Sequence, residues 1–120
     1  MSREIKFRAW DKENKKMFKV ARFDFSDYTI YSHLFSCDGF LGENCEIMQY
    51  TGNNDKKDVE IYENDIVEDE YNRKYVVVFK GDCWRCEPLS KGLKNRWISN
   101  HLMVIGNVYS SPELLEGGAE

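Results

Sequence analysis

The sequence of 120 residues has little proline, no long apolar segment and no excess of positive charge. It holds only two prolines and shows neither repeats nor low-complexity tracts, so no linker is evident. No apolar run approaches the roughly 18 residues that a membrane helix needs. The charged N-terminus lacks an apolar stretch of signal-peptide length, which argues against secretion. We therefore expect one domain in the cytoplasm, with no membrane partner.

The charge composition argues against one broad class of function. The chain has 17 Lys and Arg against 21 Asp and Glu, for a formal net charge of −4. A general nucleic-acid coat needs a basic domain, so this balance does not favour that role. A chain of this length can bury a substantial core without metal or disulfides, and the 42% hydrophobic content agrees.

Residue types that carry catalytic chemistry are few. The two histidines, His33 and His101, have no spaced metal partner and lie in no recognisable hydrolase motif. A Ser-His-Asp triad is defined by geometry, and nothing in the sequence supports one. The acidic stretch 55–70 lacks the register of a calcium-binding loop, and the pair Glu63 and Asp65 is commonplace for a turn. We interpret these acids as solvated surface charge, and we predict no catalytic residue.

The four cysteines are expected to be thiols. Cys83 and Cys86 have the spacing of half a zinc site. On a strand, however, side chains three residues apart point to opposite faces and do not share a metal ion. Cys37 and Cys45 are more widely spaced than a usual zinc pair. We expect small hydrophobic residues here, and we predict no metal and no cofactor.

Strand patterns dominate the chain. Apolar and polar residues alternate over 5–10 and resume at 17–20, which predicts a hairpin. Further strands are predicted over 46–50, 59–62, 66–67, 74–79, 83–89 and 101–109, with a bulge or bend at Gly106. Ser111 and Pro112 are typical of a helix start, which predicts a short helix over 111–116. The consecutive valines at 76–78 predict a strand buried on both faces.

These elements predict a mostly β fold of one domain over residues 1–120. Many short strands with regular turns favour a small, partly open barrel, and an SH3-like core is compatible with them. We expect the barrel core over 46–109, the N-terminal hairpin over 5–20 packed alongside it, and the short helix at 111–116.

Four blocks of sequence resemble the YopX-like proteins of bacteriophages and prophages. They are Ile5–Asp11, Met48–Gly52, Glu60–Val67 and Val104–Leu115, in this order and spread over nearly the whole chain. Two positions depart from the family pattern, because Asp58 and Asn64 stand where the family tends to have glycine. Aspartate and asparagine are the residues that best tolerate a left-handed backbone after glycine, so we expect both turns to be kept.

The resemblance implies a mostly β domain from a phage or prophage, located in the bacterial cytoplasm. It also implies a homo-oligomer. It implies no reaction, since the family consists of uncharacterised accessory proteins and provides no catalytic residue to carry over. Our prediction is a non-enzymatic protein that acts through protein–protein interaction, with a second copy or an unidentified phage or host protein as its partner.

The charges are segregated along the chain. Residues 53–70 hold eight acids and two lysines, whereas residues 73–101 hold seven basic residues and two acids. Our first interpretation is that the two stretches neutralise each other within one subunit. The second is a head-to-tail contact between subunits. The third, and our alternative function, is a basic and aromatic surface for single-stranded nucleic acid, formed by Arg73, Lys80, Trp84, Arg85, Lys94, Arg96 and Trp97.

Overall fold

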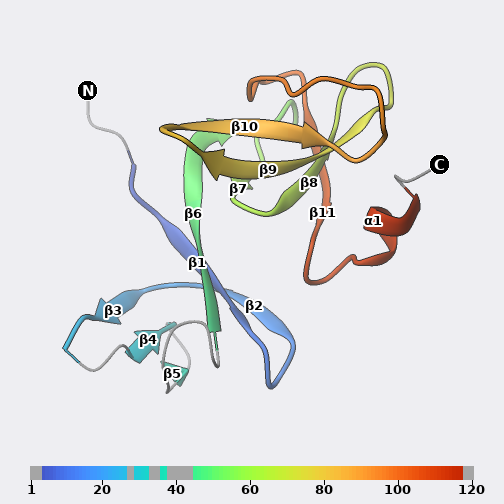
Figure 1. Cartoon of the computed structure of the whole chain (residues 1–120). Coiled ribbons are helices and arrows are strands. Elements are labelled where there is room, and N and C mark those ends of the chain that lie inside the picture. The colour runs from blue at the N-terminus through green and yellow to red at the C-terminus, as the bar shows by residue number, and fades with distance from the viewer. Residues whose placement is uncertain (1–3, 27–28, 33–35, 38–44, 118–120) are drawn as a thin grey trace. The chain divides into compact units, whose positions relative to one another are not determined.

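A computed structural model describes residues 4–26, 29–32, 36–37 and 45–117. The chain forms two compact units, Ser2–Gln49 and Tyr50–Glu120. Both are built almost entirely from antiparallel strands, and the one described helix lies near the C-terminus (Figure 1). The fold is therefore mostly β, as predicted. The assignment of residues 1–120 to a single domain stays a prediction.

The first unit contains the predicted N-terminal hairpin. Strand β1 (Phe7–Asp11) pairs with β2 (Lys16–Lys19), and the Ala9–Phe18 pair carries the buried face. The other edge of β1 pairs with the first half of β6 (Cys45–Asn54). A second small sheet consists of β3 (Arg22–Asp24), β4 (Thr29–Tyr31) and β5 (Ser36–Cys37). A buried hydrophobic cluster in this unit consists of Ala9, Phe18, Ile30 and Cys45.

The second unit contains the predicted barrel strands. The end of β6 pairs with β7 (Glu60–Tyr62). A four-stranded sheet follows in the order β10-β9-β8-β11. Its members are β8 (Asp65–Glu68), β9 (Lys74–Lys80), β10 (Cys83–Pro88) and β11 (Met103–Asn107). The sheet curls as a half-barrel, which confirms the partly open barrel (Figure 1).

One face of this sheet holds the larger hydrophobic cluster. Opposed residues of an antiparallel pair share a face, so Tyr75 and Val77 of β9 lie on the same side as Cys86 of β10. The buried members of the cluster are Ile61, Val67, Tyr75, Val77, Cys86 and Leu102. The valines at 76 and 78 are half-buried on the other face. The prediction that β9 is buried on both faces was therefore wrong.

The short helix α1 (Glu113–Gly117) and the residues just before it lie close to Gly106 of β11. The register of β11 against β8 shifts between Val104 and Gly106, which confirms the bulge predicted at the glycine. A Cβ atom at position 106 would lie 2.6 Å from Ser111 Oγ and 2.9 Å from Ser111 Cβ. Only glycine lets the strand and the helix cap approach this closely.

Two turns contain the residues that depart from the family glycines. Asp58 has a φ of 64° and Asn64 a φ of 69°, so both adopt the left-handed conformation as expected. Asn64 is held there by its backbone, because its N–H donates to the Val77 carbonyl and its carbonyl accepts from the Val108 N–H. The turn between β7 and β8 is thus fixed on both sides.

We expect Asn64→Ala to lower the free energy of unfolding by about 1 kcal/mol, because alanine is strained at positive φ. Asn64→Gly should stay within about 0.5 kcal/mol of the wild type, since glycine relieves the strain but orders more backbone on folding. Urea unfolding curves measure both changes. Equal stability of the alanine and glycine variants would show that the left-handed turn is not maintained.

We expect Gly106→Ala to lower the free energy of unfolding by about 1–3 kcal/mol, because the new methyl group overlaps Ser111. The same urea titration on the double variant Gly106→Ala/Ser111→Gly provides the control. The double variant should lose less stability than the sum of the losses in the two single variants, because the added methyl group no longer meets a serine side chain. Strict additivity of the two single effects would contradict the proposed close contact.

Candidate functional site

The turn between β8 and β9 is built around the side chain of Asp69. Its Oδ1 accepts hydrogen bonds from the backbone N–H groups of Tyr71 and Arg73, each at 2.9 Å. The Asp69 N–H donates to the Arg73 carbonyl, and Asn72 turns the chain with a φ of 63°. An aspartate that bonds its own following backbone, with an asparagine at positive φ, is a common way to close a tight turn.

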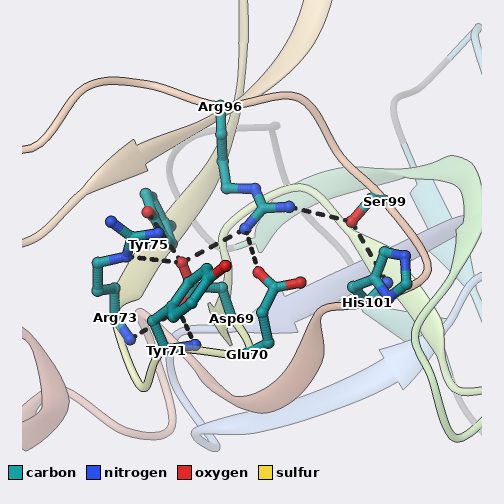
Figure 2. Close-up of polar contacts among 8 residues, drawn as sticks. All are labelled: Asp69, Glu70, Tyr71, Arg73, Tyr75, Arg96, Ser99 and His101. Carbon is teal, nitrogen blue, oxygen red and sulfur yellow. Dashed lines mark hydrogen bonds and ion pairs between the residues drawn. The ribbon is translucent and has the colours of Figure 1, made fainter.

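The second oxygen of the Asp69 carboxylate accepts hydrogen bonds from three side chains. Oδ2 accepts from Arg73 Nε at 2.9 Å, from the Tyr75 hydroxyl at 3.2 Å and from Arg96 Nη1 at 3.3 Å (Figure 2). Asp69 is only 5% exposed. Burial by itself would raise the pKa of Asp69, but the backbone and side-chain donors outweigh it and lower that pKa. The carboxylate is thus held as an anion. Burial, together with this negative charge, raises the pKa of Tyr75.

Arg96 reaches Asp69 from a segment 27 residues further along the chain. That segment is attached to β10 by two backbone hydrogen bonds between Arg96 and Cys86, at 2.8 and 3.1 Å. The guanidinium also donates to Glu70 Oε1 at 3.1 Å and to Ser99 Oγ at 3.3 Å (Figure 2). Arg96 is therefore fixed at both its backbone and its side chain.

An open groove of about 720 Å³ lies over this cluster. We call it the arginine groove, and its lining residues are Arg73, Tyr75, Gly92, Leu93, Lys94, Asn95, Arg96, Trp97 and Ser99. Trp97 is 69% exposed there. Tyr71 is equally exposed, and the Arg73 guanidinium lies over its ring at 4.7 Å from the centroid. Exposed aromatic rings beside anchored arginines are typical of binding surfaces.

The seven residues predicted for nucleic-acid binding fall into two groups. Arg73, Lys94, Arg96 and Trp97 line the arginine groove. Lys80, Trp84 and Arg85 lie instead at the turn end of the β9–β10 hairpin. Trp84 packs against the core cluster and meets Phe79 edge-on at 4.9 Å, whereas Lys80 and Arg85 occupy the opposite face of the hairpin. The seven residues do not form one surface.

Four ion pairs join the two segregated stretches of charge within the chain. Asp69 pairs with Arg73 and Arg96, Glu70 pairs with Arg96, and Glu68 pairs with Lys74. Each contact links an acid of 53–70 to a base of 73–101. These four pairs are of the kind that our first interpretation expects, whereas Lys80 pairs with Glu87 inside the basic stretch.

Three of the acids interpreted as solvated are in fact buried, so that interpretation was wrong for them. Asp55, Asp65 and Asp69 are 5%, 1% and 5% exposed. Asp55 accepts the N–H groups of Lys57 and Val59 on Oδ1 and of Val104 on Oδ2, which ties its loop to β11. Asp65 accepts the N–H of Tyr62. Each of these carboxylates satisfies backbone donors that would otherwise be buried without a partner.

The cysteines and histidines form no reactive or metal-binding cluster in the described ranges. Cys86 is fully buried, and burial raises the pKa of its thiol to about 11. Cys45 is disulfide-bonded, so the expectation of four thiols was wrong. The His101 N–H donates to Ser99 Oγ, while His33 lies outside the described residues. Within the described residues, no three His, Cys, Asp or Glu side chains group as a metal site would require.

The fold and this charged groove characterise a small β domain, and comparison with known proteins gives its family. The YopX protein family model matches residues 6–116, so the chain belongs to that family. The crystal structure of protein EF1440 from Enterococcus faecalis is similar, with a TM-score of 0.64 and 27% sequence identity. The match covers 95% of this chain and 99% of the other. No curated protein matches the chain. Among the described residues, no helix is long and apolar enough to cross a membrane.

We expect Asp69→Asn to lower the free energy of unfolding at pH 7 by at least about 2 kcal/mol, because it removes the charge that several donors share. The pKa of Asp69 is lowered in the folded protein, so its stabilising effect is complete above its ordinary pKa of about 3.9. That effect is lost as the pH falls through the folded-state pKa. Urea titrations between pH 7 and pH 2 should show a smaller loss of stability in the variant than in the wild type.

Asp55→Asn is the matched control for this prediction. Asp55 is equally buried and its pKa is also lowered, but the hydrogen bonds it accepts in the described structure come from backbone N–H groups and not from an arginine. Both variants should lose stability, whereas only Asp69→Asn should release the Arg96 guanidinium. Measurement of the exchange rate of the Arg96 Nη1 protons by NMR distinguishes the two, because Nη1 is the donor to Asp69. Identical exchange in all three proteins would contradict the anchoring role of Asp69.

Proposed function

We propose that the protein works without catalysing a reaction, through protein–protein contacts made as a homo-oligomer. The family resemblance supports an accessory role for a phage or prophage in the bacterial cytoplasm. The observation that carries the proposal is an open strand edge beside exposed aromatic surface in the second unit.

Strand β10 is one edge of the four-stranded sheet. Backbone groups of an antiparallel strand point alternately toward and away from a given neighbour. Cys86 directs its N–H and carbonyl outward, since both bond to Arg96. Trp84, two residues earlier, directs its backbone groups the same way, and no described hydrogen bond occupies them. The segment that covers β10 therefore protects one half of the edge and leaves the other open (Figure 1).

Apolar area and an unsatisfied donor accompany this open edge. Phe79 is 51% exposed although it faces the same side as Trp84. Arg85 Nε is buried and finds no hydrogen-bond acceptor among the described residues. Open edges pair with further strands, and a second copy of the chain is a ready source of one. An added strand would satisfy Trp84 and cover Phe79 together.

The ion pairs within the chain indicate whether a subunit contact at the β10 edge would be electrostatic or apolar. The principal arginines of the second unit are already paired within the chain, so charge contributes little to a subunit contact. Backbone pairing and apolar burial are insensitive to salt, whereas contacts between exposed charges are screened. A homo-oligomer of this type is therefore resistant to high salt.

We expect light scattering to give a native mass that is a multiple of 14.2 kDa at both low and high salt. Phe79→Lys should shift the protein toward the monomer, because it places a charge where apolar surface would be covered. Val59→Lys is the control, since Val59 is 48% exposed in the same unit but is not part of β9 or β10. A wild-type mass of 14.2 kDa at all concentrations would refute the homo-oligomer.

A further inference from the structure

The arginine groove is not used by the proposed contact at the β10 edge, and its composition fits a ligand of its own. We propose that the groove binds single-stranded nucleic acid, with one base stacked on Trp97 and a neighbouring phosphate held by Lys94. This inference is independent of the proposed homo-oligomer. It rests chiefly on Lys94 and Trp97, two of the seven residues that the sequence alone indicated.

Trp97 provides the stacking surface. Its indole is 69% exposed, although it follows directly after Arg96, whose backbone is bonded to β10 and whose side chain is bonded to Asp69. A large aromatic ring presented on an immobilised backbone loses little freedom when a base stacks on it. Every base has an aromatic face, so this contact suits single strands of any sequence.

Lys94 provides the charge. The two arginines of the groove are engaged by Asp69 and Glu70, so their charge is largely neutralised. Lys94 lines the same groove, is exposed, and makes no ion pair within the described ranges. Only one or two phosphates would then be contacted per chain. The affinity should accordingly depend weakly on salt, with a slope of about −0.7 in log K against log salt for each phosphate.

The remaining lining residues suit the polar edges of a nucleotide. Asn95 is exposed between Lys94 and Arg96, and its amide offers both donors and an acceptor. Ser99 Oγ lies beside the Arg96 guanidinium at the base of the cluster. A groove of about 720 Å³ is within the range of ligand sites, and its open form admits a continuous strand. A duplex hides its base faces and would not stack on Trp97.

Fluorescence anisotropy with a labelled deoxythymidine strand of about ten nucleotides tests the proposal, since single-strand sites span roughly 4–16 nucleotides. The wild type should bind the strand and should not bind the corresponding duplex. Trp97→Ala should weaken binding about 10- to 100-fold, while Trp97→Phe, which keeps an aromatic face, should weaken it less. Competition with thymidine monophosphate shows whether a single nucleotide occupies the groove or a strand is required.

Lys94→Glu and Lys80→Glu form a matched pair. Both reverse one positive charge, but Lys80 lies at the hairpin turn and pairs with Glu87, outside the groove. Only Lys94→Glu should weaken binding, by several-fold at low salt, and it should reduce the salt slope by about 0.7. Thermal unfolding of each variant confirms that these exposed substitutions leave the fold intact.

Three outcomes would overturn the proposal. The first is no binding of single strands by the wild type. The second is an equal effect of Lys80→Glu and Lys94→Glu, which would indicate general electrostatic attraction. The third is a Trp97→Ala variant that binds the strand normally but loses oligomer mass, which would make the groove a subunit contact. Loss of mass in Phe79→Lys alone concerns the homo-oligomer and leaves the groove proposal standing.

Discussion

The carboxylate of Asp69 is the interaction on which the second unit depends most. One buried anion closes the β8–β9 turn through backbone donors and holds Arg73, Tyr75 and Arg96 through its other oxygen. Arg96 in turn brings the long connection after β10 back against the sheet. Because a buried charge is stable only when several donors satisfy it, these groups constrain one another. The arginine groove is the surface that this constraint produces.

Aspartate side chains that accept hydrogen bonds from nearby backbone N–H groups also shape other turns. Asp11 accepts the N–H groups of Glu13 and Asn14 in the N-terminal hairpin, and Asp55 does the same for the loop that meets β11. With only two prolines in the chain, aspartate and asparagine shape most of the turns described. Their short side chains bond the local backbone and tolerate positive φ, as Asp58 and Asn64 do. A chain of many short strands therefore owes its geometry to buried carboxylates as much as to apolar packing.

The dependence of the turns on aspartate and asparagine explains which features of the fold could be predicted from the sequence. The hairpins, the bulge at Gly106 and the left-handed turns depend on local residue types, and the local pattern predicted them. Burial of Asp69 depends on Arg96, which is 27 residues away, so a count of local charge assigned this carboxylate to solvent. The spacing of Asp69, Asn72 and Arg73 is the one local signal, because it describes an aspartate-capped turn.

The seven residues of the predicted basic and aromatic surface do not form one surface, for a related reason. Alternation along a strand places Trp84 on the core face of β10 and Arg85 on the other face, so neighbours in sequence do not share a surface. The run of valines in β9 was similarly ambiguous, since β-branched residues suit a half-buried face as well as a core. The composition indicated that basic and aromatic side chains would be near one another. Only the register of β9 and β10 determines on which face each of them lies.

The ion pairs within the chain also limit the kinds of partner that the surface can bind. A surface whose arginines are already satisfied gains little from an acidic partner, because each new contact must replace an existing one. The groove still offers the exposed ring of Trp97 and the exposed ammonium group of Lys94, and the hairpin offers Phe79 and the open half of β10. The open half of β10 lies at the turn end of the β9–β10 hairpin, whereas Lys94 and Trp97 lie on the segment after β10. The proposed assembly and the proposed ligand binding thus use different surfaces of one unit, and assembly would multiply a weak site through avidity.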